Sequence, residues 1–314
     1  MLALLKITLL GKFSVVWGNE KVDGIQARKV EELLCYLLLF RDHPQSRETL
    51  SQILWEDQPP IKAKKNLRQA LSHLQRALHQ ACANVPGLRL NVESDWIQID
   101  ANIDSCLDVV EFEKSYHLVA GKQARELTDD DFVAMQNAIV LYKGDLLEGW
   151  YQDWCAIERE RFQTMYLALL DKLVQYCEVH QNYDLGLAYG TEILRRERAS
   201  ERAHRQMMRL HYMAGDRTQA IYQYERCKLA LDEELGVEPS QRTMDLYQQI
   251  RSDTYQPPLF IAKQPATDHS EIYSAFSDIV GRLEEFSEML TKIELHVQEE
   301  MGALENAHGI LKKA

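Results

Sequence analysis

The chain has 314 residues, of which 46% are hydrophobic and 27% charged, a composition typical of a globular protein with a large core and roughly two or three domains. Its 36 basic and 48 acidic side chains give a formal net charge of −12, which argues against non-specific binding of nucleic acid over the whole surface. No run of about 18 apolar residues occurs, so we expect no membrane span. The six scattered cysteines are typical of a reducing environment, so we expect a cytoplasmic location.

Charge is distributed unevenly along the chain. Residues 1–105 hold 13 basic and 12 acidic side chains, whereas residues 106–314 hold 23 and 36. Because an acidic surface repels phosphate, we expect any contact with DNA to be confined to the first 105 residues.

The first 60 residues are expected to form three short strands followed by two short helices. Residues 4–10, 13–17 and 21–22 are expected to be strands, with a turn at Gly18-Asn19. Apolar side chains at helical spacing predict helices over residues 28–40 and 47–54, and Ser46 is placed to cap the second helix. Residues 55–60 end in two prolines, which favours a loop over the whole segment.

The stretch from Gln58 to Val92 contains six Lys or Arg residues and no Asp or Glu, although the chain as a whole is acidic. Leucines at positions 67, 71, 74 and 78 form one narrow apolar stripe of a helix over residues 62–81. At about 100° per residue, the opposite edge of this helix carries a polar set: Lys62, Lys65, Gln69, Ser72 and Arg76, flanked by Arg68 and His73. Such an edge suits a DNA major groove, and the alternative is an ordinary solvated helix face.

Two alternating segments, residues 88–92 and 96–99, predict a β-hairpin whose turn is Glu93-Ser94-Asp95. Strands, three helices of which the third is basic, and a final hairpin form the element order of a winged helix. Arg89 is the one cation of the hairpin, and the turn is acidic. We therefore expect no strong grip of the minor groove by this wing.

Residues 108–251 are expected to be almost entirely helical. Apolar periodicity predicts helices over residues 109–119, 131–141, 154–180, 183–195, 200–214, 217–236 and 239–251. The motif Asn182-Tyr183-Asp184 with Ala188 recurs 32 residues later as Ala214-Gly215-Asp216 with Ala220, near the period of tetratricopeptide-like helix pairs. In such pairs a small alanine lets two helices approach closely, so we expect a helical repeat domain.

Residues 252–269 contain three prolines and are expected to form a linker. Beyond them, apolar residues alternate at spacings of four and three, as in the seam of a coiled coil: Ile272, Phe276, Ile279, Leu283, Phe286, Leu290, Ile293 and Val297. This seam either joins two copies of the chain or docks on the chain's own body. We favour self-association as a homodimer.

Several of these segments resemble one known family. One set is similar to the winged helix of antibiotic-regulatory-type bacterial transcriptional activators, which itself resembles the response-regulator (OmpR-type) winged helix: Arg28-Lys29 with Leu33-Leu34, Ser46-Arg47-Glu48, Leu54-Trp55 and Asn66-Leu67-Arg68. A second set is similar to the bacterial transcriptional activator domain that accompanies it: Asp108 with Glu111-Phe112, Tyr142-Lys143-Gly144-Asp145, Trp154 with Glu158-Arg159-Glu160-Arg161, and Leu235-Gly236-Val237-Glu238-Pro239-Ser240. The resemblance covers roughly residues 4–251.

The resemblance implies a DNA-binding transcriptional regulator, in particular an activator. Its implied partners are double-stranded promoter DNA, which related activators occupy as direct repeats, RNA polymerase, and a second copy of the chain. The loop before the basic helix is implied to meet RNA polymerase, which makes Glu56 and Asp57 candidate contacts. DNA contacts are expected from the basic helix and the first strand of the hairpin: Lys62, Lys64, Lys65, Arg68, Gln69, Ser72, His73, Arg76 and Arg89.

The sequence offers no support for an enzyme. It contains no phosphate-binding Walker loop, no H-E-x-x-H and no G-x-S-x-G, and its six cysteines form no C-x-x-C pair. We expect no catalytic residues, no cofactor and no metal, and we interpret the cysteines as small core residues.

We thus predict a mainly α protein with small β elements in four parts: a winged-helix DNA-binding domain at residues 1–104, a tetratricopeptide-like helical activator domain at 105–251, a linker at 252–269 and a coiled-coil helix at 270–314. The main rival is a helical-repeat interaction scaffold whose winged helix binds protein, which the acidic body and the acidic wing turn favour. A small-molecule sensor is a third interpretation, for which the sequence shows no specific pocket.

Overall fold

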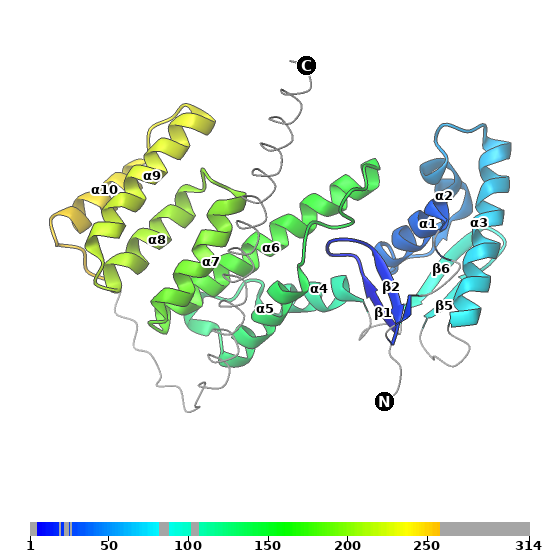
Figure 1. The fold of residues 1–314 in the computed structure, drawn as a ribbon, viewed down its shortest axis with the longest axis horizontal. Helices are drawn as coiled ribbons and strands as arrows, with labels where there is room; N and C mark the ends of the chain where they lie inside the picture. The colour runs from blue at the N-terminus through cyan, green and yellow to red at the C-terminus, as the bar shows by residue number, and fades with distance from the viewer. Residues whose placement is uncertain are drawn as a thin grey trace, which may run out of the picture. The chain divides into compact units, whose positions relative to one another are not determined.

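The computed structural model describes residues 5–18, 20–21, 25, 27–81, 88–101 and 107–257. Figure 1 shows the elements in order, with small sheets and three helices first and the helices α4 to α10 after them. The predicted fold class, mainly α with small β elements, is confirmed for this part of the chain. The predicted coiled-coil seam and most of the predicted linker lie outside the described residues.

The N-terminal part contains two small antiparallel sheets. The first has the order β1-β2-β3, from β1 (Leu5–Thr8), β2 (Ser14–Trp17) and β3 (Glu20–Lys21). The second has the order β4-β6-β5, from β4 (Gln45–Ser46), β5 (Leu88–Val92) and β6 (Trp96–Ala101). β5 and β6 are the predicted hairpin, and the alternation of side chains along β6 buries Ile97 and Ile99.

Helices α1 (Arg28–Leu39), α2 (Arg47–Leu54) and α3 (Pro60–Ala81) complete the winged helix. Ser46 caps α2 as predicted, since its hydroxyl accepts the Glu48 backbone N–H at 3.2 Å. The expectation that Pro60 belongs to the preceding loop is wrong, because Pro60 is the first residue of α3. Proline suits that position because its missing N–H would have no helical partner and its fixed φ is helical.

The rest of the described chain is helical. It comprises α4 (Asp108–Val119), the short 3-10 helix η1 (Ala124–Glu126), α5 (Asp129–Leu141), α6 (Asp153–Val179), α7 (Tyr183–Arg196), α8 (Glu201–Met213), α9 (Arg217–Leu235) and α10 (Gln241–Arg251). Each predicted helix is confirmed, with ends that differ by at most two residues. α5 begins two residues earlier than predicted because Thr128 and Asp131 form a reciprocal capping box at its start.

Helices α6, α7 and α8 approach one another at a glycine and not at the expected alanine. Ala188 is exposed, so its predicted place at a close helix contact is wrong, whereas Ala220 is fully buried. A Cβ atom at Gly186 would lie 3.0 Å from Leu210 Cδ1 and 3.1 Å from Cys177 Cβ. The absence of a side chain at Gly186 therefore allows α7 to pack closely against both neighbours. The repeat relation itself stays a prediction.

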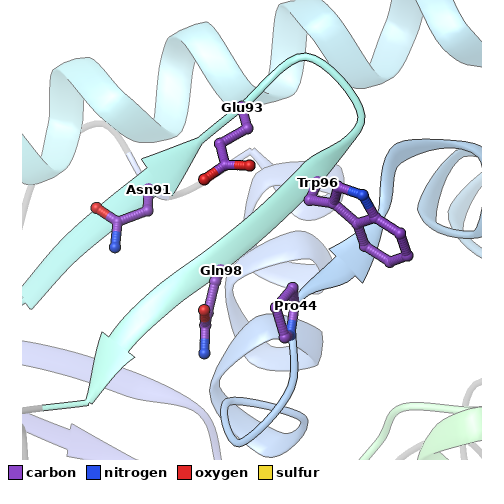
Figure 2. A pocket seen from close by; sticks show the side chains of 5 residues that line it. All are labelled: Pro44, Asn91, Glu93, Trp96 and Gln98. Carbon is purple, nitrogen blue, oxygen red and sulfur yellow. The ribbon is translucent and has the colours of Figure 1, made fainter.

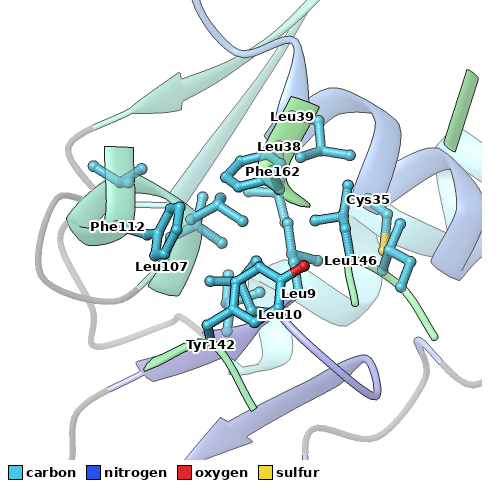
Figure 3. Packing of buried hydrophobic residues seen from close by; sticks show 14 of the residues in the cluster. Leu9, Leu10, Cys35, Leu38, Leu39, Leu107, Phe112, Tyr142, Leu146 and Phe162 are labelled. Atoms are coloured by element: carbon cyan, nitrogen blue, oxygen red, sulfur yellow. The ribbon is translucent and has the colours of Figure 1, made fainter. Parts of the chain in front are cut away.

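One continuous hydrophobic core runs from the winged helix into the helical part of the chain. Figure 3 shows a section of it in which side chains before β2 and on α1 pack together with side chains from α4, α6 and the segment between α5 and α6: Leu9, Leu10, Cys35, Leu38, Phe112, Leu146 and Phe162. The two parts therefore share buried surface and cannot unfold independently without exposing it.

Asp108 stands at the centre of this shared core. Its carboxylate accepts the backbone N–H groups of Leu9 and Leu10 at 2.8 to 2.9 Å, and that of Val109 at 2.8 Å. Burial raises the pKa of Asp108 above the ordinary carboxyl value, while the three N–H groups oppose that rise. The start of α4 is thus tied to the chain directly after β1.

Ion pairs and polar contacts also stabilise the junction between the winged helix and the helical part of the chain. Glu113 on α4 lies 2.6 Å from Arg41, which follows α1, and 2.8 Å from Arg161 on α6. Arg159, part of the motif that resembles the activator domain, donates to three backbone carbonyl groups within residues 146–150. These charged side chains therefore make contacts within the chain that stabilise its fold.

The described residues offer little reactive chemistry. Cys35, Cys155, Cys177 and Cys227 are buried, as predicted for core residues, and burial raises the pKa of the Cys177 and Cys227 thiols to about 12. In the same residues, no three His, Cys, Asp or Glu side chains gather in a way that could hold a metal ion. None of the described helices combines the length and the apolar character needed to cross a bilayer.

Candidate nucleic-acid interface

α3 has a buried apolar edge and an exposed polar edge, as its sequence predicts. Its leucine stripe is at most 5% exposed: Leu67, Leu71, Leu74 and Leu78. Burial of a leucine contributes about 1.5–3 kcal/mol. Four of them on one edge fix which face of α3 points away from the core.

The outward face of α3 carries every residue of this helix that the sequence predicts for DNA contact. All of these side chains are exposed: Lys62, Lys64, Lys65, Arg68, Gln69, Ser72, His73 and Arg76. From Lys62 to Arg76 the face extends about 21 Å along the helix axis, at about 1.5 Å per residue. It is long enough to present several side chains to a groove at once.

The start of α3 places positive charge on positive charge. A helix N-terminus carries partial positive charge, so a basic side chain in the first turn costs about 0.3–1 kcal/mol. The first turn of α3 contains Lys62 and no acidic residue. This arrangement disfavours the isolated helix but concentrates positive potential where an anion such as a phosphate would bind.

The cations of α3 differ in how they are engaged. Lys64 Nζ lies 3.0 Å from Oε1 of Glu48 on α2, and the two side chains are 50% and 63% exposed. Arg76 lies along its own helix, where its Nε donates to the Ser72 carbonyl at 3.2 Å. Within the described part of the chain, Lys62, Lys65 and Arg68 have no ion pair, so their charges are available to a ligand.

A cleft of about 530 Å³ opens between α3, the start of α2 and the turn of the hairpin. Its lining mixes cations and acids: Ser46, Arg47, Glu48, Lys64, Leu67, Arg68, Ser94 and Asp95. Arg47 holds this cleft in shape, since its backbone N–H donates to the Asp95 carbonyl at 2.9 Å and its Nη1 to the Glu93 carbonyl at 3.2 Å. Arg47 was not predicted as a site residue, although its position directly after the capping Ser46 could have indicated that it lies at this surface.

The hairpin contributes little positive charge to this cleft. Arg89 on β5, a predicted DNA contact, is exposed, but it is not part of the described lining of the cleft beside α3. The turn presents exposed Glu93 and Asp95 instead. A phosphate near the turn would therefore meet carboxylates, and the structure places the predicted cations mainly on α3.

The loop between α2 and α3 presents the two acids predicted to contact RNA polymerase. Glu56 and Asp57 are exposed there, and Ile61 at the start of α3 is 87% exposed. Trp55 packs partly against the core, with Lys29 Nζ 6.0 Å from the centre of its ring. The indole thus anchors the loop, and the acids and Ile61 form its surface.

Comparison with known proteins gives the family of the helical part. Residues 107–251 match the family described as bacterial transcriptional activator domain. The chain is similar to the transcriptional regulatory protein MoaR1 of Mycobacterium tuberculosis, with 24% identity over 243 residues that cover 71% of each protein. It is also similar to the regulatory protein AfsR of Streptomyces coelicolor, with 25% identity over 241 residues, which are 74% of this chain and 23% of AfsR.

The fold has a likeness among solved structures. The structure of Mycobacterium tuberculosis EmbR in complex with a low affinity phosphopeptide matches with a TM-score of 0.66 and 16% identity, over 90% of this chain and 71% of that one. At this identity the match concerns the fold, which supports the arrangement of a winged helix followed by a helical domain. Together these findings agree with the resemblance drawn from the sequence: residues 107–251 match the bacterial transcriptional activator domain, and the chain is similar to bacterial transcriptional regulatory proteins.

Proposed function

We propose that this protein is a sequence-specific DNA-binding transcriptional activator that reads the major groove with α3. The observation that carries the proposal is the exposed polar face of α3, which gathers free cations in a chain whose net charge is −12. DNA supplies the matching negative charge along a groove wide enough for a helix.

The exposed face of α3 makes two kinds of contact with DNA, to phosphates and to base edges. Phosphates are neutralised by four exposed cations, which gives affinity and a steep dependence on salt: Lys62, Lys65, Arg68 and Arg76. Gln69 and Ser72 present donors and acceptors to base edges, and a glutamine amide can bond adenine through two hydrogen bonds. The acidic remainder of the chain repels phosphate and so confines DNA to α3 and its surroundings.

The other partners follow from the remaining surfaces. Glu56 and Asp57 contact RNA polymerase from the loop before α3. The helical domain positions the winged helix, and the seam from Ile272 to Val297 joins two copies of the chain as a homodimer that occupies direct repeats. The hydrophobic core that the winged helix and the helical domain share supports this arrangement, because it fixes the position of the winged helix relative to the helical domain.

The test is selection of DNA sites from a random duplex pool by the full chain, followed by affinity measurements on the enriched site. We expect enrichment of one motif, and the double variant Arg68→Ala with Arg76→Ala should lose most of the affinity. The matched control removes two exposed cations from α10, Arg242→Ala with Arg251→Ala, and should bind as the wild type does. Failure to enrich any sequence would favour the interaction scaffold, and equal affinity of the two double variants would overturn the assignment of α3.

A further inference from the structure

The wing sheet carries an exposed tryptophan on its outer face. Trp96 begins β6 and is 50% exposed, whereas Ile97 beside it is fully buried. Neighbouring side chains on a strand point to opposite faces, so Trp96 points away from the core that Ile97 and Ile99 enter. Tryptophan is one of the residue types enriched among the side chains that dominate binding at the centres of protein interfaces.

Trp96 forms one side of a shallow pocket of about 410 Å³. Figure 2 shows the side chains that line it: Pro44, Asn91, Glu93, Trp96 and Gln98. The Glu93 backbone N–H donates to the Trp96 carbonyl at 2.9 Å, which makes these two residues directly opposed across the hairpin. Their side chains therefore share one face, with Cβ atoms about 5 Å apart.

The chemistry of this pocket is aromatic and acidic. Its described lining contains the Glu93 carboxylate and no cation, and exposed Asp42 precedes Pro44 by two residues. The face of an indole attracts cations, and a neighbouring carboxylate adds an ion pair. Gln98 offers a further acceptor, because its Nε2 donates to the Arg41 carbonyl at 3.3 Å and its Oε1 remains for a ligand.

Arginine is the side chain that matches all of these groups. Its planar guanidinium stacks on an aromatic ring, bonds a carboxylate through two N–H groups and still has N–H groups for an amide oxygen. Lysine offers a point charge without the stacking plane. Pro44, which also lines the pocket, adds apolar surface that the residues next to such an arginine can contact.

We propose that the outer face of the wing sheet, formed by Pro44, Asn91, Glu93, Trp96 and Gln98, is a docking site for an arginine-bearing segment of a partner protein. Charge decides against the other occupants: Glu93 repels DNA phosphates, and residues 106–314 of a second copy carry 36 acidic and 23 basic side chains. The site does not depend on the proposed contact of α3 with DNA, because it lies on the face of the hairpin opposite to the core.

Fluorine NMR of the full chain tests the site directly. The five tryptophans are replaced by 5-fluorotryptophan, and Trp96→Phe assigns the signal of residue 96. The probe is N-acetylarginine methylamide, and its control is the citrulline analogue, which has the same shape without the charge. We expect the Trp96 signal to shift and saturate with the arginine probe alone, while the other four signals stay in place.

Variants and competitors separate the possible occupants. Glu93→Gln should weaken the arginine probe about three- to five-fold, the effect of losing an exposed ion pair, whereas Asp57→Asn removes an exposed acid elsewhere and should change nothing. An unmoved Trp96 signal, or equal shifts with citrulline, would overturn the proposal. A duplex oligonucleotide that displaces the probe would make this face a DNA contact, and a shift with protein concentration alone would make it a contact between copies; either result overturns the assignment.

Discussion

Replacing Glu48 with glutamine is expected to steepen the salt dependence of DNA binding. In the free protein the Glu48 carboxylate lies 3.0 Å from Lys64 Nζ, at the edge of the face proposed to meet DNA. Glutamine keeps the size of the side chain and removes the charge that competes with phosphate for Lys64. Both partners are exposed, so the substitution should change the free energy of unfolding by less than about 1 kcal/mol.

The size of the effect follows from counterion release. Each neutralised phosphate contributes about −0.9 to the slope of log affinity against log salt concentration. One additional phosphate bound by Lys64 therefore steepens the slope by about 0.9. A four-fold rise in salt should then reduce the affinity of the variant about 3.5-fold more than that of the wild type.

Fluorescence anisotropy on the selected duplex between about 50 and 200 mM salt measures this slope. The matched control repeats the substitution in a Lys64→Ala background, where the slope should no longer respond to residue 48. An unchanged slope in Glu48→Gln would refute the competition between carboxylate and phosphate. A change that persists without Lys64 would show that Glu48 acts on DNA by itself.

Buried groups give three further expectations. Asp108→Ala leaves the Leu9 and Leu10 N–H groups without an acceptor and should lower the free energy of unfolding in urea by about 3 kcal/mol, more than Asp108→Asn does. Leu74→Ala, at a fully buried site on α3, should cost about 2–5 kcal/mol in the same titration. Burial lowers the pKa of His204, so below about pH 6.5 the unfolded chain binds a proton that the folded chain does not, and the melting temperature should fall. The fall should be smaller in His204→Gln; an equal fall would contradict this assignment.

Local patterns in the sequence are sufficient to predict most single elements. The leucine stripe of α3, the alternation along β6 and the cap at Ser46 are set by neighbours within a few residues, and the structure agrees with each. Pro60 is one exception. A pair of prolines reads as a break, yet the second proline fits the first position of a helix.

The sequence does not show the joint between the two parts of the chain. Asp108 accepts hydrogen bonds from residues almost 100 positions earlier, and Leu10 forms a bridge to Leu146. Neither contact leaves a periodic trace, because it depends on how elements distant in the sequence pack. The same holds for the pairing of Lys64 with Glu48 across two helices.

The candidate site was therefore predictable as a set of exposed residues on one helix, but not as a cleft. The polar face of α3 follows from its spacing alone. The position of Arg47, which ties the wing turn to α2, follows only from the fold. The exposure of Trp96 beside Glu93 likewise requires the register of the hairpin.

A structure of the full chain bound to its selected duplex tests the central claim most directly. We expect α3 in the major groove, with Gln69 and Ser72 within hydrogen-bonding distance of base edges and Lys62, Lys65 and Arg68 at phosphates. A complex in which DNA lies elsewhere, with the polar face of α3 open to solvent, would contradict it.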